Sequence, residues 1–78
     1  MHMKNEIRDA LDEVLPLVNM DSDFLFSELD SLGVTTILMI LSEKYGIELD
    51  STNATPKNFR NLESLAAMVK NKLEEKNL

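Results

Sequence analysis

Apolar residues recur every three or four positions in three stretches of the chain, which is the pattern of an amphipathic helix. The first stretch predicts a helix over about residues 4–17. Its apolar face comprises Ile7, Ala10, Leu11, Val14, Leu17 and Val18. Pro16 lies in the last turn, where a proline ring and its missing N–H end or bend a helix.

The second stretch predicts a helix from residue 31 to about residue 45, with Gly46 as its C-terminal stop. Asp30 precedes it as an N-cap, because its carboxylate can accept the N–H of Leu32 or Gly33. A rotation of about 100° per residue gives this helix two faces. The core face comprises Val34, Ile37, Leu38, Leu41 and Tyr45, and the solvent face comprises Ser31, Leu32, Thr35, Met39 and Ser42.

Two loops separate the predicted helices. Residues 19–30 are polar and acidic, but they contain four apolar residues that predict a long loop held against the core. These are Phe24, Leu25, Phe26 and Leu29. The second loop covers about residues 47–54 and ends at Thr55-Pro56, which predicts a cap followed by a short helix that turns Phe59 inward.

The third stretch predicts a last helix over about residues 62–76, capped by Asn61. Its buried stripe comprises Leu62, Leu65, Ala66, Val69 and Leu73. The sequence therefore predicts an all-α fold, a small four-helix bundle with three longer helices and a short third helix.

The length of 78 residues allows one domain, which we expect over residues 4–76. Met1 and His2 look like an added leader, with Met3 as the natural start. No segment has the apolar region of an export signal, and the longest apolar run, residues 37–41, is too short to span a bilayer. We therefore expect a soluble, cytoplasmic monomer with no membrane partner.

The net charge of −6 is concentrated in one part of the chain. Residues 1–30 hold eight acidic and two basic side chains, whereas residues 31–78 hold six of each. This field repels phosphate backbones and favours basic partner surfaces, so nucleic-acid binding is not expected. The alternative is that the charge serves only solubility.

The residue types exclude several kinds of chemistry. The chain has no cysteine and one histidine, which excludes a disulfide framework, a thiolate nucleophile and a His/Cys metal site. A serine hydrolase needs a base beside its nucleophile, and His2 is far from any candidate serine in the sequence. A calcium loop beginning at Asp21 fails because Leu25, Phe26 and Leu32 occupy positions that need ligands or glycine. We therefore expect neither an enzyme nor a metal site.

The remaining candidate is Asp30-Ser31-Leu32 at the start of the second predicted helix. A phosphodiester on Ser31 would lie beside the positive end of the helix dipole and the free N–H groups of the first turn. Asp30 adds a carboxylate that a modifying enzyme could use to hold a metal ion. Because the three residue types are common, the tripeptide alone is weak evidence for a modification site. Its position at the start of a helix makes this interpretation more specific.

With this motif and helix order, residues 4–73 resemble the acyl carrier protein family of phosphopantetheine-binding carrier domains. The resemblance implies that Ser31 receives 4'-phosphopantetheine from coenzyme A through a magnesium-dependent holo synthase, which Asp30 assists. The arm would end in a thiol that holds acyl groups as thioesters for fatty-acid, specialised lipid or polyketide biosynthesis. It also implies that partner enzymes with basic patches contact Leu32, Thr35, Met39 and Glu43, and that Ile37, Leu41, Phe59 and Leu65 line an acyl pocket.

Two departures from the family pattern keep alternatives open. The glycine that often precedes the motif is absent, since Glu28-Leu29 runs directly into Asp30. The second helix also lacks the row of exposed acids typical of fatty-acid carriers, because Gly33, Thr36 and Ser42 occupy positions expected to be exposed. An aminoacyl or peptidyl carrier is therefore an alternative, and an unmodified helical adaptor is a further one. Met39 could instead fill a gap in the core.

Overall fold

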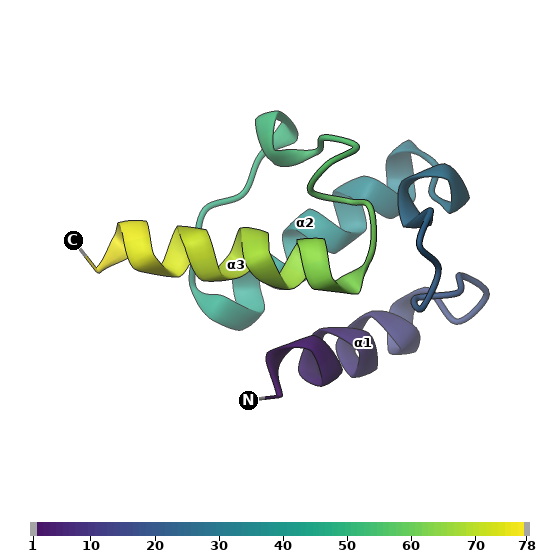
Figure 1. Cartoon of the computed structure of the whole chain (residues 1–78), viewed down its shortest axis with the longest axis horizontal. Helices are drawn as coiled ribbons and strands as arrows, with labels where there is room; N and C mark the ends of the chain where they lie inside the picture. Colours follow the sequence, from purple (N-terminus) through teal and green to yellow (C-terminus); the bar gives the residue numbers. More distant parts are fainter. Residues whose placement is uncertain (1, 78) are drawn as a thin grey trace.

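The computed structural model describes residues 2–77, and none of these residues forms a β-strand. Three α-helices are present: α1 (Met3–Val14), α2 (Ser31–Tyr45) and α3 (Leu62–Lys76). Two short 3-10 helices lie in the connections: η1 (Leu25–Glu28) and η2 (Ser51–Asn53). The three α-helices pack on one another in all three pairings. The connection from α1 to α2 lies at the end of the bundle where α2 begins, and the connection from α2 to α3 runs along the side of the bundle (Figure 1).

One apolar core joins the three helices, and residues from both long connections complete it. The fully buried side chains of the core are those of Ile7, Leu11, Leu25, Ile37, Leu41, Phe59, Leu65 and Val69. Leu62, Met68, Met20, Leu38 and Ile47 are nearly as well buried. None of the described residues with a polar or charged side chain is buried, so the core is apolar throughout.

Helix α1 is shorter than the apolar pattern predicts. It ends at Val14, and Leu15 has φ −129° and ψ 61°, outside the helical region. Leu15 precedes Pro16, and the proline ring disfavours the helical conformation of the residue before it. Val14 is consequently 48% exposed and Leu17 is 99% exposed, so their predicted places on the buried face were wrong.

The predicted ends of α2 and α3 are confirmed. Asp30 Oδ1 accepts the N–H of Gly33 at 2.7 Å, which satisfies a first-turn donor of α2. Gly46 ends α2 in the left-handed conformation, with φ 63°, which glycine adopts without a steric penalty. Asn61 caps α3, because its Oδ1 accepts the N–H of Ser64 at 2.9 Å while Ser64 Oγ accepts the N–H of Asn61 at 3.0 Å.

The predicted short third helix is only a single turn, so the four-helix count is not confirmed. The N–H of Phe59 donates to the carbonyl of Thr55 at 3.0 Å, and Thr55 Oγ1 accepts the N–H of Asn58 at 3.1 Å. The chain is extended again at Asn61, where φ is −159° and ψ is −177°, because this residue caps α3. Only the six residues from Thr55 to Arg60 precede the cap at Asn61, so the helical turn that begins at Thr55 is not followed by another. The inward position of Phe59 is confirmed.

The connection over residues 19–30 is held against the core, as predicted, but not by all four apolar residues. Leu25 is fully buried, and its N–H donates to the carbonyl of Arg60 at 2.9 Å. The ring of Phe26 meets the ring of Phe59 edge to face, with centroids 6.1 Å apart. Phe24 is 73% exposed, so its predicted place against the core was wrong.

The two predicted faces of α2 are largely confirmed. Ile37, Leu38 and Leu41 are buried, whereas Val34 and Tyr45 are half-buried at the edge of the core. Met39 is 54% exposed, which excludes the alternative that it fills a core gap. Gly33 is buried, so its expected exposure was wrong.

None of the helices within residues 2–77 is long and apolar enough to cross a membrane. Helix α1 begins at Met3, one residue before the predicted start. The expectation that the first residues are an added leader concerns Met1, which lies outside the described residues, and His2, whose carbonyl accepts the N–H of Glu6 at 2.9 Å.

Candidate functional site

Ser31 is the first residue of α2, and its side chain is exposed. Asp30 before it has an extended backbone, with φ −94° and ψ −179°, and its carboxylate turns back to the N–H of Gly33. Thr35 Oγ1 donates to the carbonyl of Ser31 at 2.9 Å, which adds a side-chain bond to the first turn. The helix therefore begins at one fixed residue and presents that residue's hydroxyl to solvent.

Gly33 explains how the turn before Ser31 is made without the glycine expected at an earlier position. A Cβ at Gly33 would lie 3.3 Å from Asp30 Oδ1 and 3.3 Å from Leu29 Cδ2. The missing side chain therefore lets the Asp30 carboxylate and the Leu29 side chain close over the first turn. The sequence analysis missed this role, although a glycine inside a predicted helix is a signal of close approach.

Two hollows flank the start of α2. One has a volume of about 320 Å³. It is lined by Phe26, Leu29, Asp30, Ser31, Val34, Thr35 and Ala54. The other has a volume of about 240 Å³ and shares Leu29 and Asp30 with the first. A group attached to Ser31 would therefore have a groove of mixed polar and apolar lining beside its point of attachment.

The predicted partner-binding residues lie on one side of α2, in line with Ser31. Leu32 is 74% exposed and Met39 is 54% exposed, and Thr35 and Glu43 are also exposed. Their spacing of three or four residues places them on neighbouring turns. These residues therefore form one exposed face that begins beside Ser31 and runs along α2 towards its end.

The predicted pocket residues are placed differently. Ile37, Leu41, Phe59 and Leu65 are all fully buried members of the one core cluster. None of them lines the two hollows beside Ser31. A group that reached them would have to part the core.

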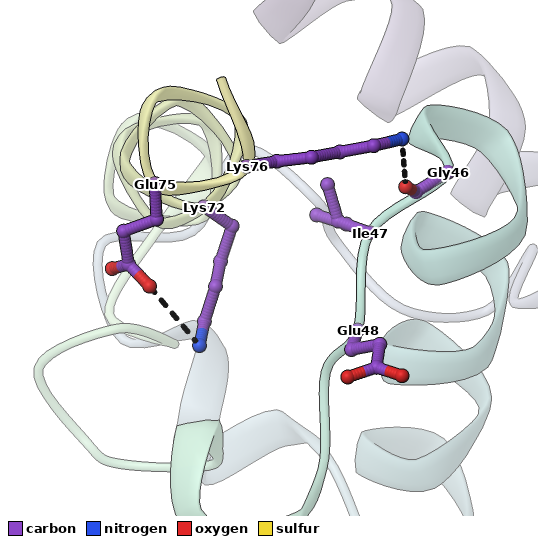
Figure 2. Close-up of a pocket in the computed structure, with 6 residues that line it drawn as sticks. All are labelled: Gly46, Ile47, Glu48, Lys72, Glu75 and Lys76. Carbon is purple, nitrogen blue, oxygen red and sulfur yellow. Dashed lines mark hydrogen bonds and ion pairs between the residues drawn. The ribbon is translucent and has the colours of Figure 1, made fainter. Parts of the chain in front are cut away.

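A further hollow of about 400 Å³ lies at the other end of α2, between the residues that follow α2 and the last turns of α3 (Figure 2). A 15-residue helix is about 22 Å long, so this hollow is remote from Ser31. Lys76 extends across it, and its Nζ donates to the carbonyl of Gly46 at 2.7 Å. Lys72 lies 3.8 Å from Glu75 on the same helix.

The titratable groups with shifted pKa values are also away from Ser31. Burial raises the pKa of Tyr45 to about 12, and the hydrogen bond from its hydroxyl to Glu6 at 3.0 Å acts in the same direction. The hydroxyl and the N–H of Thr52 lower the pKa of Asp50. Within residues 2–77 no cluster of three or more His, Cys, Asp or Glu side chains could hold a metal ion.

A family model described as "Phosphopantetheine attachment site" matches residues 2–69. The chain belongs to this phosphopantetheine attachment site family. The match covers α1, α2, both connections and half of α3. No curated protein and no solved structure matches the chain significantly.

Members of the phosphopantetheine attachment site family hold 4'-phosphopantetheine covalently. They are carriers that work with phosphopantetheinyl transferases and synthases. The chain is therefore a phosphopantetheine carrier. The start of α2 suits that group, because an exposed hydroxyl there adjoins helix N–H groups that favour a phosphate and a groove that can receive an arm. The bound group supplies a thiol on a long arm, and the chain supplies its anchor.

Proposed function

We propose that Ser31 is the residue that receives the phosphopantetheine arm. The observation that supports this is which of the six serine hydroxyls form hydrogen bonds within the chain, and where the others lie. Four serines use their Oγ in hydrogen bonds within the chain: Ser22, Ser27, Ser42 and Ser64. Of the other two, Ser51 begins a three-residue 3-10 helix, and only Ser31 begins an α-helix.

The transfer is a displacement at phosphorus. Ser31 Oγ attacks the phosphorus of coenzyme A that bears the pantetheine, a new serine phosphodiester forms, and 3',5'-ADP leaves with the broken P–O bond. The hydroxyl proton goes to a base of the transferase. Asp30 uses one carboxylate oxygen for the cap, which leaves the other to help hold the transferase's magnesium ion.

The loaded chain carries its cargo as a thioester, and we propose an acyl cargo for lipid or polyketide biosynthesis. The exposed face of α2 supports a specialised pathway over general fatty-acid synthesis, since Glu43 is its one acidic residue and Lys44 follows directly. An aminoacyl or peptidyl cargo is the alternative. For a long alkyl chain, Ile37, Leu41, Phe59 and Leu65 remain the predicted lining.

Partner enzymes are proposed to dock on the α2 face formed by Leu32, Thr35, Met39 and Glu43. Two exposed apolar side chains beside the attachment serine can be desolvated on docking, which is how a small interface gains free energy. An adaptor that is never modified could use the same surface. Modification of Ser31 distinguishes the two functions.

The test is to incubate the purified chain with a promiscuous phosphopantetheinyl transferase, coenzyme A and magnesium, and then to measure its mass. We expect the wild type and Ser51→Ala to gain one phosphopantetheine, and Ser31→Ala to gain none. Ser51 is the matched control because it is also an exposed serine at the start of a helix. An unchanged wild-type mass, or an Ser31→Ala variant that still gains the group, contradicts the proposal.

A further inference from the structure

A second hollow lies next to the groove beside Ser31, because Phe26 lines both of them. The second hollow has a volume of about 340 Å³ and is lined by Asp23, Phe24, Phe26, Ser27, Pro56 and Arg60. A long arm attached at Ser31 that passes the Phe26 side chain would bring its end to the second hollow. We call this second hollow the Phe24 groove.

The walls of the Phe24 groove are held in place by the fold. The N–H of Phe24 donates to Ser22 Oγ at 3.0 Å, and the carbonyl of Phe24 accepts from Ser27 Oγ at 2.7 Å. The ring of Phe26 rests on the buried ring of Phe59. Phe24 thus presents a 73% exposed ring on a backbone that two hydrogen bonds hold in place.

The polar side chains of the groove carry opposite charges. Asp23 and Arg60 both line it, and neither forms an ion pair with another of residues 2–77. A cargo with one net charge would meet an attractive and a repulsive group together, which favours an uncharged cargo. The Arg60 guanidinium can donate to a thioester carbonyl, since its planar N–H groups suit oxygen acceptors.

Neither hollow beside Ser31 is lined by the side chains predicted to form an internal acyl pocket. The side chains that would have to move for an internal pocket, among them Ile37, Leu41 and Leu65, are fully buried in one close-packed cluster. Parting them would expose apolar surface and leave unfilled volume, both of which cost free energy. An aromatic or branched acyl group gains contact with Phe24, Phe26 and Pro56 without that cost.

We propose that the Phe24 groove is the cargo site of this carrier, and that it takes a compact, uncharged aryl or branched acyl thioester. The inference rests on the proposed attachment of the arm to Ser31. It assigns the cargo to the surface between η1 and Arg60 and gives the chemical class of the group carried.

The test uses the full chain loaded at Ser31 by a promiscuous transferase with 3-phenylpropionyl-coenzyme A. Amide NMR spectra of the loaded and the unacylated holo forms are compared, and the rate of thioester cleavage by hydroxylamine is followed by mass. We expect shifts at Phe24, Ser27 and Arg60, and cleavage slower by on the order of fivefold than for the same thioester on free pantetheine.

Phe24→Ser should lose the protection and the shifts while keeping its helical circular dichroism, because the ring is largely exposed. Leu17→Ser is the matched control, since Leu17 is 99% exposed and does not line the groove, and it should keep both. Shifts at Ile37, Leu41 and Leu65, no shifts beyond those of the holo arm, or full protection in Phe24→Ser would each overturn the cargo site. Failure of the wild type to gain any group overturns the attachment proposal as well.

Discussion

Asp30 combines two separable functions, and its substitution offers the sharpest test of the site. One carboxylate oxygen caps α2 through the N–H of Gly33 at 2.7 Å. The carboxylate charge is proposed to help hold the magnesium ion of the transferase. Asp30→Ala removes both functions, whereas Asp30→Asn keeps a capping oxygen and removes the charge.

The magnitudes follow from the geometry. Loss of an N-cap to alanine costs about 1 kcal/mol, and the loss of a negative charge at the helix N-terminus adds about 0.3 kcal/mol for an exposed residue such as Asp30. A loss of about 1 kcal/mol lowers the unfolding midpoint of a chain of this size by about 4–8 °C. We therefore expect Asp30→Ala to melt about 5–10 °C below the wild type and Asp30→Asn within about 3 °C of it.

Thermal unfolding followed by circular dichroism measures the first function, and the initial rate of phosphopantetheine gain measures the second. Both variants should be modified at least about tenfold more slowly than the wild type, because both lack the carboxylate. If Asp30→Asn melts as low as Asp30→Ala, the cap is not what stabilises α2. If Asp30→Asn is modified at the wild-type rate, the carboxylate has no part in the transfer.

Two further predictions concern the rest of the fold. The pKa of Tyr45, the one tyrosine, is raised from 10.0 to about 12 in the folded chain. The contribution of the protonated Tyr45 hydroxyl to stability is therefore complete below pH 10 and is lost as the pH rises through about 12. Urea unfolding should show this loss in the wild type and not in Tyr45→Phe. Glu6→Gln should lower the pH at the midpoint of the phenolate absorbance change. A midpoint that Glu6→Gln leaves unchanged would contradict the hydrogen bond from Tyr45 to Glu6. Lys76→Met should reduce the free energy of unfolding by about 0.5–1 kcal/mol through loss of the bond to Gly46. Lys72→Met, which removes only a surface ion pair, should change it by less than about 0.5 kcal/mol, and equal losses in the two variants would contradict the role of Lys76.

The helix ends could be predicted from the sequence because capping is local chemistry. The capping partners lie within three or four residues of the cap, as they do for Asp30, Gly46 and Asn61, so a short stretch of sequence identifies them. The sequence also predicted that Pro16 ends or bends the first helix, and α1 ends at Val14 because the proline restricts the residue before it, Leu15.

The remaining differences depend on contacts between distant segments. The burial of Gly33 depends on Leu29 folding over α2, and the exposure of Phe24 depends on where η1 meets Arg60. The two hollows that share Phe26 could not be predicted, because each brings residues of the first connection together with residues from 54–60. The predicted short third helix is not confirmed, because the residue that caps α3 ends the turn that begins at Thr55.

The hydroxyls along α2 have a consequence for recognition at different ionic strengths. Thr35 and Thr36 donate to carbonyls one turn back in their own helix, which leaves these hydroxyls only their acceptor capacity towards a visiting protein. Leu32 and Met39 are exposed on the proposed docking face, so we expect an enzyme that docks there to gain part of its binding free energy from the removal of apolar surface from water. Ions do not screen that part, whereas they weaken the attraction between Glu43 and a basic partner surface. The complex should therefore weaken in concentrated salt without being lost.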